Sequence, residues 1–171
     1  MSFATKIPEV RDTVAALYQL YRDDVYRYLL RLDLGSGQAM DLCQEAFFRL
    51  FQVLRDGQRI ENPRGWLFRV AHNSGLNARV SSRRNDSWDE TLEARVASAE
   101  RNPEQEMLEK EKFTCIHRAV DGLTDRQRQC LHLRNEGFRY HEIAEIMGVS
   151  TSNVNEAVRE AIKRIRKALC E

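Results

Sequence analysis

The chain has 171 residues, of which 31% are charged, and its formal net charge at pH 7 is +1. This length allows one domain or two small ones. No apolar run is long enough for a transmembrane helix, and the N-terminus lacks the apolar centre of a signal peptide. We therefore expect a cytoplasmic protein without membrane insertion. The small net charge hides segregation, because residues 62–84 hold five arginines and no acid, whereas residues 86–111 hold nine acids and three bases.

Prolines, glycines and cap residues divide the sequence into helices, and no β pattern occurs. The predicted helices in the first part span residues 9–32, 38–55 and 63–84, and whether the first is broken near Tyr21 is left open. A further helix is expected from about residue 103 to 120. We predict an all-α protein with two small domains, residues 9–84 and 104–170, joined by an acidic, flexible linker at residues 85–103.

The predicted helix at residues 38–55 has two unlike faces. Its core stripe consists of Met40, Cys43, Phe47, Leu50, Phe51 and Leu54. Its opposite face carries Asp41, Gln44, Glu45, Phe48 and Gln52. An exposed phenylalanine beside carboxylates favours a protein interface, and the alternative is a solvated face with an isolated aromatic residue.

The predicted helix at residues 63–84 is also divided. The side expected to face the core carries Leu67, Val70, Ala71, Ser74 and Ala78. The expected outer side carries Arg69, His72, Asn73, Leu76, Arg79 and Arg83, and Trp66 lies near the preceding loop. A basic surface without acids, next to an aromatic residue, favours nucleic-acid binding; the alternative is that the arginines only keep the surface hydrated. We interpret His72 as a surface or phosphate-contacting group rather than a base.

Residues 124–169 show the pattern of a helix-turn-helix within a small helical domain. Thr124 and Gln127 form a predicted capping box, and Gly137 is a predicted helix stop. The next, short helix carries Ile143, Ala144 and Met147 on one apolar face. Three turn residues follow, with Gly148 at the sharp turn, Val149 buried and Ser150 as N-cap.

The last predicted helix is strongly two-sided. Its apolar stripe consists of Val154, Ala157, Val158, Ala161, Ile162, Ile165, Ala168 and Leu169. Its other face consists of Thr151, Ser152, Asn155, Glu156, Arg159, Lys163 and Arg166. A polar helix end that is held outward by a partner helix fits the major groove of DNA, so the pattern predicts a promoter or operator reader.

The four cysteines do not indicate a metal centre. There is no CxxC pair, and in the pairs Cys115/His117 and Cys130/His132 the two side chains point apart on a helix. We expect buried thiols at Cys43 and Cys130, no structural disulfide, no metal and no cofactor. No catalytic motif occurs, so no catalytic residue is assigned and an enzyme is not expected. A redox role for Cys43 or Cys170 stays open.

Three segments together resemble a known family. The stretch AMDLCQEAFFRLF resembles the D-L-x-Q-E-x-F motif in region 2 of bacterial RNA polymerase sigma factors of the extracytoplasmic-function type. NPRGWLFRVAHN resembles the segment that follows in region 2. The stretch from Leu123, with its L-x-x-x-Q-R, E-I-A and G-V-S motifs, resembles region 4. The order and spacing of the motifs cover nearly the whole chain.

The resemblance implies three binding surfaces. The first would dock on the coiled-coil clamp helices of the polymerase β′ subunit and consists of Asp41, Gln44, Glu45 and Phe48. The second would melt the minus-ten element and hold its unpaired bases; its candidates are Asn62, Arg64, Trp66, Arg69, His72, Asn73, Arg79 and Arg83. The third, in a domain that would bind the β flap, would read the minus-35 element; its candidates are Arg139, Tyr140, Thr151, Ser152, Asn155, Glu156, Arg159 and Lys163.

The chain departs from the family pattern in two places. Asn77 stands where many members carry Asp, and Asn155 and Glu156 stand where many carry Lys or Arg. A different minus-35 sequence is therefore expected, since Glu accepts from cytosine and Asn pairs with adenine. Control is expected from a separate anti-sigma protein or from expression level. The alternative function is a self-standing helix-turn-helix regulator of the response-regulator output type, which leaves the two-faced helix without a partner.

Overall fold

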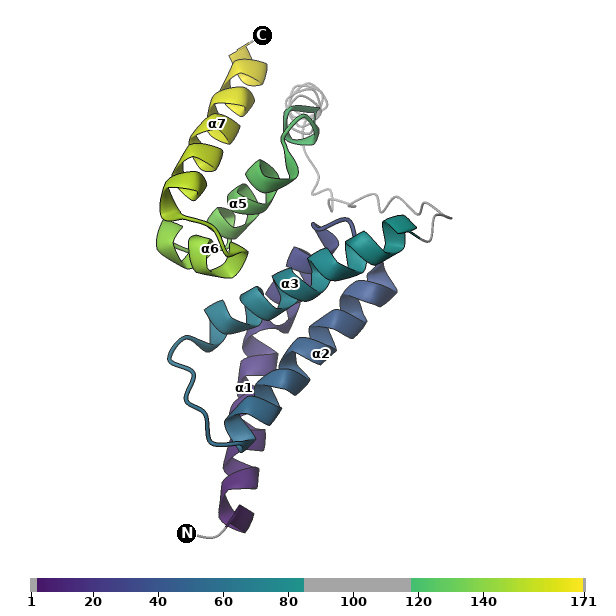
Figure 1. Ribbon diagram of the computed structural model, residues 1–171, viewed down its shortest axis with the longest axis vertical. Helices are drawn as coiled ribbons and strands as arrows, with labels where there is room; N and C mark the ends of the chain where they lie inside the picture. Colours follow the sequence, from purple (N-terminus) through teal and green to yellow (C-terminus); the bar gives the residue numbers. More distant parts are fainter. Residues whose placement is uncertain (1–2, 85–117, 171) are drawn as a thin grey trace, which may run out of the picture.

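The structure is a computed structural model that describes residues 3–84 and 118–170. In this part of the chain helices are the only regular secondary structure, as predicted. The helices form two groups, an N-terminal one and a C-terminal one (Figure 1). Their bounds are α1 Phe3–Leu30, α2 Ser36–Arg55, α3 Pro63–Arg84, α5 Asp125–Asn135, α6 Tyr140–Met147 and α7 Thr151–Cys170. Residues 118–121 are helical as well, while the predicted linker lies outside the described residues.

The first three helices form one packed unit. α1 runs without a break through Tyr21 and packs on both α2 and α3. Leu29 near the end of α1 and Leu32 in the turn after it are buried and approach α3 at Gly75. A Cβ atom at Gly75 would lie 2.7 Å from Cδ1 of Leu32, so any larger residue here would force the buried leucine side chains to move. α3 begins as predicted, with Asn62 as its cap: the amide of Gly65 donates to Asn62 Oδ1 at 2.9 Å.

The second group of helices is a helix-turn-helix, as predicted. Thr124 and Gln127 form the expected capping box at the start of α5. Gly137 has φ 88° and Gly148 has φ 66°, the left-handed conformation that ends α5 and α6 at the predicted positions. Ser150 caps α7, because its hydroxyl accepts from the amide of Asn153 at 3.2 Å.

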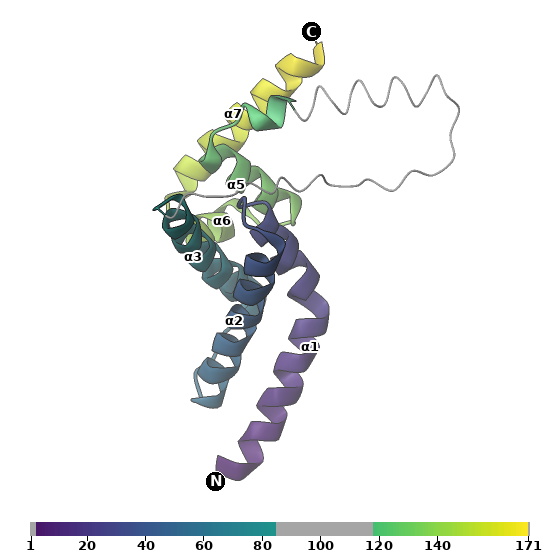
Figure 2. The same ribbon diagram turned by 90° about the vertical axis from the view of Figure 1, so that its right-hand side faces the viewer.

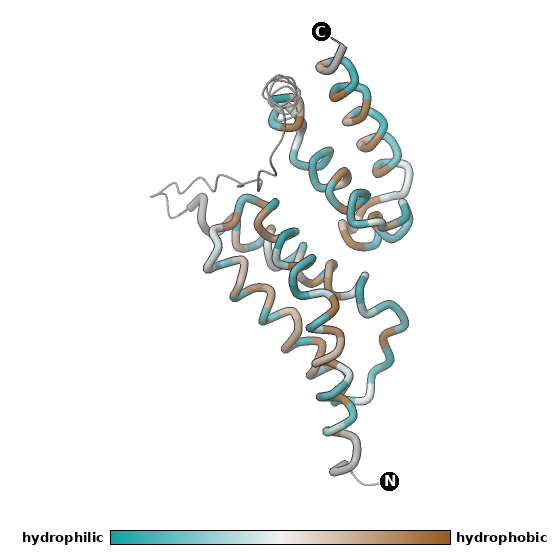
Figure 3. The backbone as a smooth tube through the Cα atoms, turned by 180° about the vertical axis from the view of Figure 1, so that it is seen from behind, coloured by the Kyte–Doolittle hydropathy of each residue, from teal (hydrophilic) through white to brown (hydrophobic). Residues whose placement is uncertain are grey.

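The predicted apolar stripes are confirmed at their centres and fail at their edges. Hydrophobic and hydrophilic residues alternate along the helices (Figure 3). Cys43 and Leu50 in α2 are buried, but Met40, expected in the core, is 43% exposed. In α7, Val154 and Ala161 are fully buried, but Ile162, also expected in the core, is 39% exposed.

The two groups of helices are in contact. α6 packs against α3, and both views show these helices side by side (Figures 1 and 2). The ring of Phe138, in the turn between α5 and α6, meets the ring of Phe68 of α3 edge-on at 4.8 Å. Both rings are buried, so the hydrophobic core continues from one half into the other. None of the helices at residues 3–84 and 118–170 combines the length and hydropathy that a membrane span requires.

Candidate polymerase and nucleic-acid interfaces

The outer face of α2 has the exposure expected of a docking surface. Asp41 and Gln44 are exposed, and the ring of Phe48 is 59% exposed. Glu45 is partly exposed and forms an ion pair with Arg49 one turn further along the helix. The structure thus brings together the four residues predicted for this face, with an open aromatic ring beside the carboxylates.

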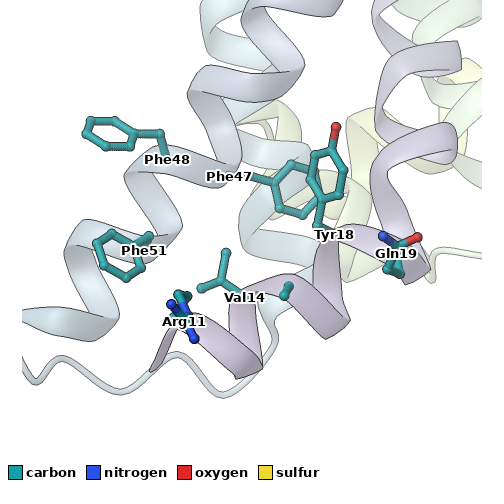
Figure 4. A pocket seen from close by; sticks show the side chains of 8 residues that line it. Arg11, Val14, Tyr18, Gln19, Phe47, Phe48 and Phe51 are labelled. Carbon is teal, nitrogen blue, oxygen red and sulfur yellow. The ribbon is translucent and has the colours of Figure 1, made fainter. Parts of the chain in front are cut away.

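Next to this face lies an apolar groove between α1 and α2. Its floor includes Tyr18 and Phe47, whose rings meet edge-on at 4.9 Å. Phe51 and Val14 continue the groove, while Phe48 points away from Tyr18 and Phe47 (Figure 4). The sequence reasoning missed the contribution of α1. The available signal was the apolar spacing of Val14, Leu17 and Tyr18 on that helix.

The start of α3 and the loop before it form the candidate minus-ten surface. Trp66 is half-buried, whereas Arg69 and Asn73 are exposed. Asn62, Trp66 and Arg69 line a hollow together with the loop at residues 58–61. Glu142 of α6 lies on the other side of this hollow. An aromatic ring, amides and an arginine in one hollow are groups that stack on bases and pair with a nucleic-acid backbone.

His72 does not belong to this surface, and its interpretation as a surface or phosphate-contacting group is wrong. It is only 2% exposed, and its Nδ1 lies 2.7 Å from the hydroxyl of Tyr28. Burial lowers the pKa of His72 to about 4. Nδ1 of the neutral ring can accept a hydrogen bond from the Tyr28 hydroxyl, so both polar groups are satisfied within the core.

Arg79 is engaged in ion pairs, and its side chain is 15% exposed. Its guanidinium lies 2.9 Å from Asp33 and 3.0 Å from Asp125 of α5. Arg79 was predicted to face outward, but in this conformation two carboxylates cover its guanidinium. Arg83 lies on the last turn of α3, and its side chain is outside the described residues.

Arg64 is half-buried between the two groups of helices. Its guanidinium carbon lies 4.4 Å from the ring centre of Phe138, a cation–π contact. One of its terminal nitrogens donates to the carbonyl oxygen of Glu136 at 2.6 Å. A group predicted to contact DNA is thus held by the other half of the protein.

The helix-turn-helix presents the predicted outer face. Arg139 is exposed, and the half-buried ring of Tyr140 lies 5.5 Å from the guanidinium carbon of Arg134. On α7 the exposed residues include Thr151, Ser152, Asn155, Glu156, Arg159 and Lys163. Their exposure, opposite the buried Val154 and Val158, is the arrangement that a major-groove reader requires.

The described cysteines are buried thiols, as expected. Burial raises the pKa of both Cys43 and Cys130 to about 11, so their reactive thiolate forms are scarce at neutral pH. The side chains of Cys115 and Cys170 lie outside the described residues. Within residues 3–84 and 118–170, no group of three or more potential ligands could hold a metal ion.

Family models match both halves of the chain. The model for Sigma-70 region 2 matches residues 17–85, and the model for Sigma-70 region 4 matches residues 113–169. The ECF RNA polymerase sigma-E factor of Escherichia coli (strain K12) is 33% identical over 143 residues, which cover 78% of this chain and 73% of that protein. RNA polymerase sigma factor YlaC of Bacillus subtilis is 28% identical over 162 residues, which cover 92% of each chain.

Two solved structures share the fold. The sigma factor RpoE from Bartonella quintana, in complex with the anti-sigma factor NepR, has a TM-score of 0.67 at 19% identity and covers 91% of this chain and 95% of its own. CnrH, in complex with the cytosolic domain of CnrY, has a TM-score of 0.63 at 16% identity and covers 98% of this chain and 94% of its own. At these identities the likeness shows the fold alone.

Proposed function

Because the chain belongs to the extracytoplasmic-function family of RNA polymerase sigma factors, which direct transcription initiation at specific promoters and are not enzymes, we propose that three of its surfaces divide this task. The observation that carries the proposal is the separation of these surfaces: an apolar and acidic face on α2, a basic and aromatic face on α3, and a polar face on α7. The self-standing regulator is not favoured, because region 2 of the family matches residues 17–85.

The α2 face binds core polymerase, at the β′ clamp helices, in this proposal. Phe48 supplies the apolar anchor, and Asp41 and Glu45 supply charge for a basic partner surface. Both kinds of group are available without disturbing the core, since Cys43, Phe47 and Leu50 hold α2 in place from its other side.

The α3 face holds the unpaired bases of the minus-ten element. Trp66 is the stacking group, while Asn62, Arg69 and Asn73 are placed to meet base edges and phosphates. Arg64 joins them when the two halves of the protein separate. His72 contributes only by fixing α3 to α1 through Tyr28.

The α7 face reads the minus-35 element as duplex, while its half of the protein binds the β flap. Its early turns are nearly neutral, because Arg159 is the only cation among the exposed residues from Thr151 to Arg159. Base preference then depends on Asn155 and Glu156, and affinity depends on attachment to the polymerase, which raises the local concentration of the helix at its site.

A separate anti-sigma factor acts as the control partner in this proposal, in a bacterial cytoplasm. The support is indirect: the sigma factor RpoE from Bartonella quintana, which shares the fold, was solved in complex with the anti-sigma factor NepR.

The direct test combines the purified protein with core polymerase and genomic DNA and maps the 5′ ends of the transcripts. Starts should gather downstream of one shared two-part sequence, and they should be absent with core polymerase alone. A matched reaction contains the variant Glu45→Lys/Phe48→Ala, which should give none of these starts. If wild-type protein leaves the transcripts of core polymerase unchanged, the proposal is wrong.

A further inference from the structure

The charges of α7 are divided between its two ends. Residues 151–158 carry one acid and no cation, whereas residues 159–167 carry five cations and one acid. All five cations are exposed. Arg164 turns back onto its own domain, where it donates to the carbonyl oxygen of Gly122 at 2.9 Å. The second half of α7 is therefore strongly basic, although its first half is the proposed reader of base edges.

One outer stripe of α7 joins the proposed reading residues to three of these cations. At 3.6 residues per turn, positions three or four residues apart lie on the same face of a helix. The stripe consists of Ser152, Asn155, Arg159, Lys163 and Arg166. All of them are exposed, whereas Val154, Val158 and Ala161 on the other side of the helix are buried. The stripe is thus neutral at its start and cationic toward its end.

The cations of this stripe are not neutralised by the protein. Among the described residues, Arg159, Lys163 and Arg166 form no ion pair and no side-chain hydrogen bond, whereas Arg49 of α2 pairs with Glu45. Arg159 and Lys163 are one turn apart and repel each other, which lowers the stability of the helix. An anion that lies along the stripe would remove this repulsion.

The length of α7 places the last cations outside the groove that its first turns would enter. The helix has 20 residues and is therefore about 30 Å long. Lys163 and Arg166 lie about 12 Å and about 17 Å along the axis from Asn155. The major groove is only about 12 Å wide and about 8.5 Å deep. When Asn155 faces base edges, these two cations therefore face the sugar–phosphate strand at the border of the groove.

The surroundings of α7 leave this second half accessible. α6 packs beside the start of α7, and the last turns of α7 extend away from α6 toward the C-terminus (Figure 1). α5 and Gly122 contact α7 on the side opposite the stripe, where Ala161 is buried. A long ligand can thus follow the stripe from the reading end to Arg166.

We infer that Lys163 and Arg166, at the cationic end of this stripe, bind phosphates of the duplex DNA that flanks the minus-35 element. The inference rests on the proposed function of α7 as reader of that element. It divides two tasks along one helix: the neutral first turns provide sequence preference, and the last turns provide affinity for any sequence, because a phosphate contact carries no base information. An acidic protein surface would suit the same cations, but DNA is favoured because the stripe continues without a break from the reading residues.

Removal of the two outermost cations tests the inference. In Lys163→Gln/Arg166→Gln both changed side chains are exposed, and glutamine keeps the helix propensity. The matched control, Arg22→Gln/Arg27→Gln, removes the same charge from exposed positions of α1. Fluorescence anisotropy with the full-length proteins compares a labelled promoter duplex with an unrelated duplex at several salt concentrations. At about 50 mM salt the variant should bind both duplexes about tenfold more weakly than the control, and the slope of log affinity against log salt should be smaller by about two.

A neutral DNA backbone locates the contact. Single phosphates in the flanks of the minus-35 element are replaced by uncharged methylphosphonates. Wild-type protein should lose affinity at one or two of these positions. Lys163→Gln/Arg166→Gln should lose nothing more at the same positions, because its contact is already gone. Asn155→Ala, which removes a reading residue, should remain sensitive to them.

The inference is wrong if the double variant binds both duplexes as tightly as the control and with the same salt slope. A loss confined to the promoter duplex would place the two cations at base edges and would contradict the inference as well. Unchanged DNA binding with reduced transcription by the holoenzyme would assign them to an acidic protein surface instead. A failure of the proposed function looks different: wild-type protein then binds neither duplex at low salt, and its holoenzyme initiates equally well when the minus-35 element is randomised. That result would overturn the inference together with the proposed function of α7.

Discussion

The hydroxyl of Tyr28 and Nδ1 of His72 lie 2.7 Å apart in the interior, although 44 residues separate them in sequence. Tyr28 is fully buried and also packs its ring against Phe68. The bond ties α1 to the middle of α3, the helix that carries the candidate minus-ten residues. Because burial disfavours the charged form of each partner, it lowers the pKa of His72 and raises the pKa of Tyr28.

The stability of the protein should fall as the pH falls from about 6.5 to about 4. An unfolded His titrates near 6.5, whereas the pKa of folded His72 is about 4, so only the unfolded state takes up the proton in this window. Above pH 6.5 the neutral, buried His72 contributes fully to the free energy of unfolding. By about pH 4 this contribution, about 3 kcal/mol, is lost. His132, whose pKa burial and two arginines lower to about 4, acts in the same direction. Urea unfolding between pH 7.5 and 4.5 measures the effect.

A matched variant separates His72 from the other titrating groups. Tyr28→Phe/His72→Leu removes both polar partners, a change that leaves no unsatisfied group in the core. Its stability should decline less between pH 6.5 and 4.5 than that of wild type. The same slope in both proteins would show that His72 keeps its ordinary pKa and does not destabilise the protein at low pH.

Local sequence signals predicted the helices and their ends. The capping box of Thr124, the glycines that end α5 and α6, and the Asn62 cap each depend on residues within a few positions of one another. Because all the residues of such a pattern lie within one short stretch of sequence, the pattern predicts a helix and its ends without knowledge of the fold. Helix α1 was predicted six residues too short at its start, where no apolar period marks it.

Contacts between distant helices were beyond such signals. The helical period of residues 63–84 predicts an outer position for His72, and only the approach of α1 brings Tyr28 to it and covers it. Arg64 and Glu136 are 72 residues apart, so nothing near either residue indicates that the two halves meet there. The predicted burial was wrong at edge positions such as Ile162 for the same reason, because the partner helix determines how wide the buried stripe is.

The variant Glu45→Lys/Phe48→Ala should lose binding to core polymerase while keeping its helicity. Phe48 is 59% exposed and Glu45 is partly exposed, so the changes spare the core. Loss of an aromatic anchor with a charge reversal should cost about 2 kcal/mol or more, roughly thirtyfold in affinity. Co-purification with core polymerase is the measurement. Leu20→Ala, which removes an apolar side chain that is 64% exposed on α1, is the control and should bind normally.

Free protein should bind a minus-35 duplex only weakly, with a dissociation constant of roughly 10 µM or more at physiological salt. The early turns of α7 expose Arg159 as their only cation, so few phosphates are neutralised. Fluorescence anisotropy with labelled duplex, with and without core polymerase, compares the two states. Tight and sequence-specific binding by the free protein would favour the self-standing regulator instead.

The variant Glu156→Lys should change the preferred minus-35 sequence and strengthen general DNA affinity. Glu156 is exposed near the start of α7, at the edge of the groove that this helix forms with the start of α5, whereas Val154 and Val158 are buried. The substitution removes an acceptor that only certain base edges satisfy and adds a cation that any phosphate attracts. Transcription by the holoenzyme from a promoter library randomised across the minus-35 element measures the preference.

The control for this experiment is Glu160→Lys, which makes the same charge change one turn later on α7. Glu156 and Glu160 both line the groove between α7 and the start of α5, but Glu156 is exposed, whereas Glu160 is half-buried and lies further from the N-terminal end of α7 that would enter the major groove. The control variant should raise general affinity and leave the preferred sequence unchanged, because a phosphate contact carries no base information. Should Glu156→Lys also leave the preference unchanged, Glu156 points away from the bases, and the reading register of α7 must be centred on Ser152 and Asn155 instead.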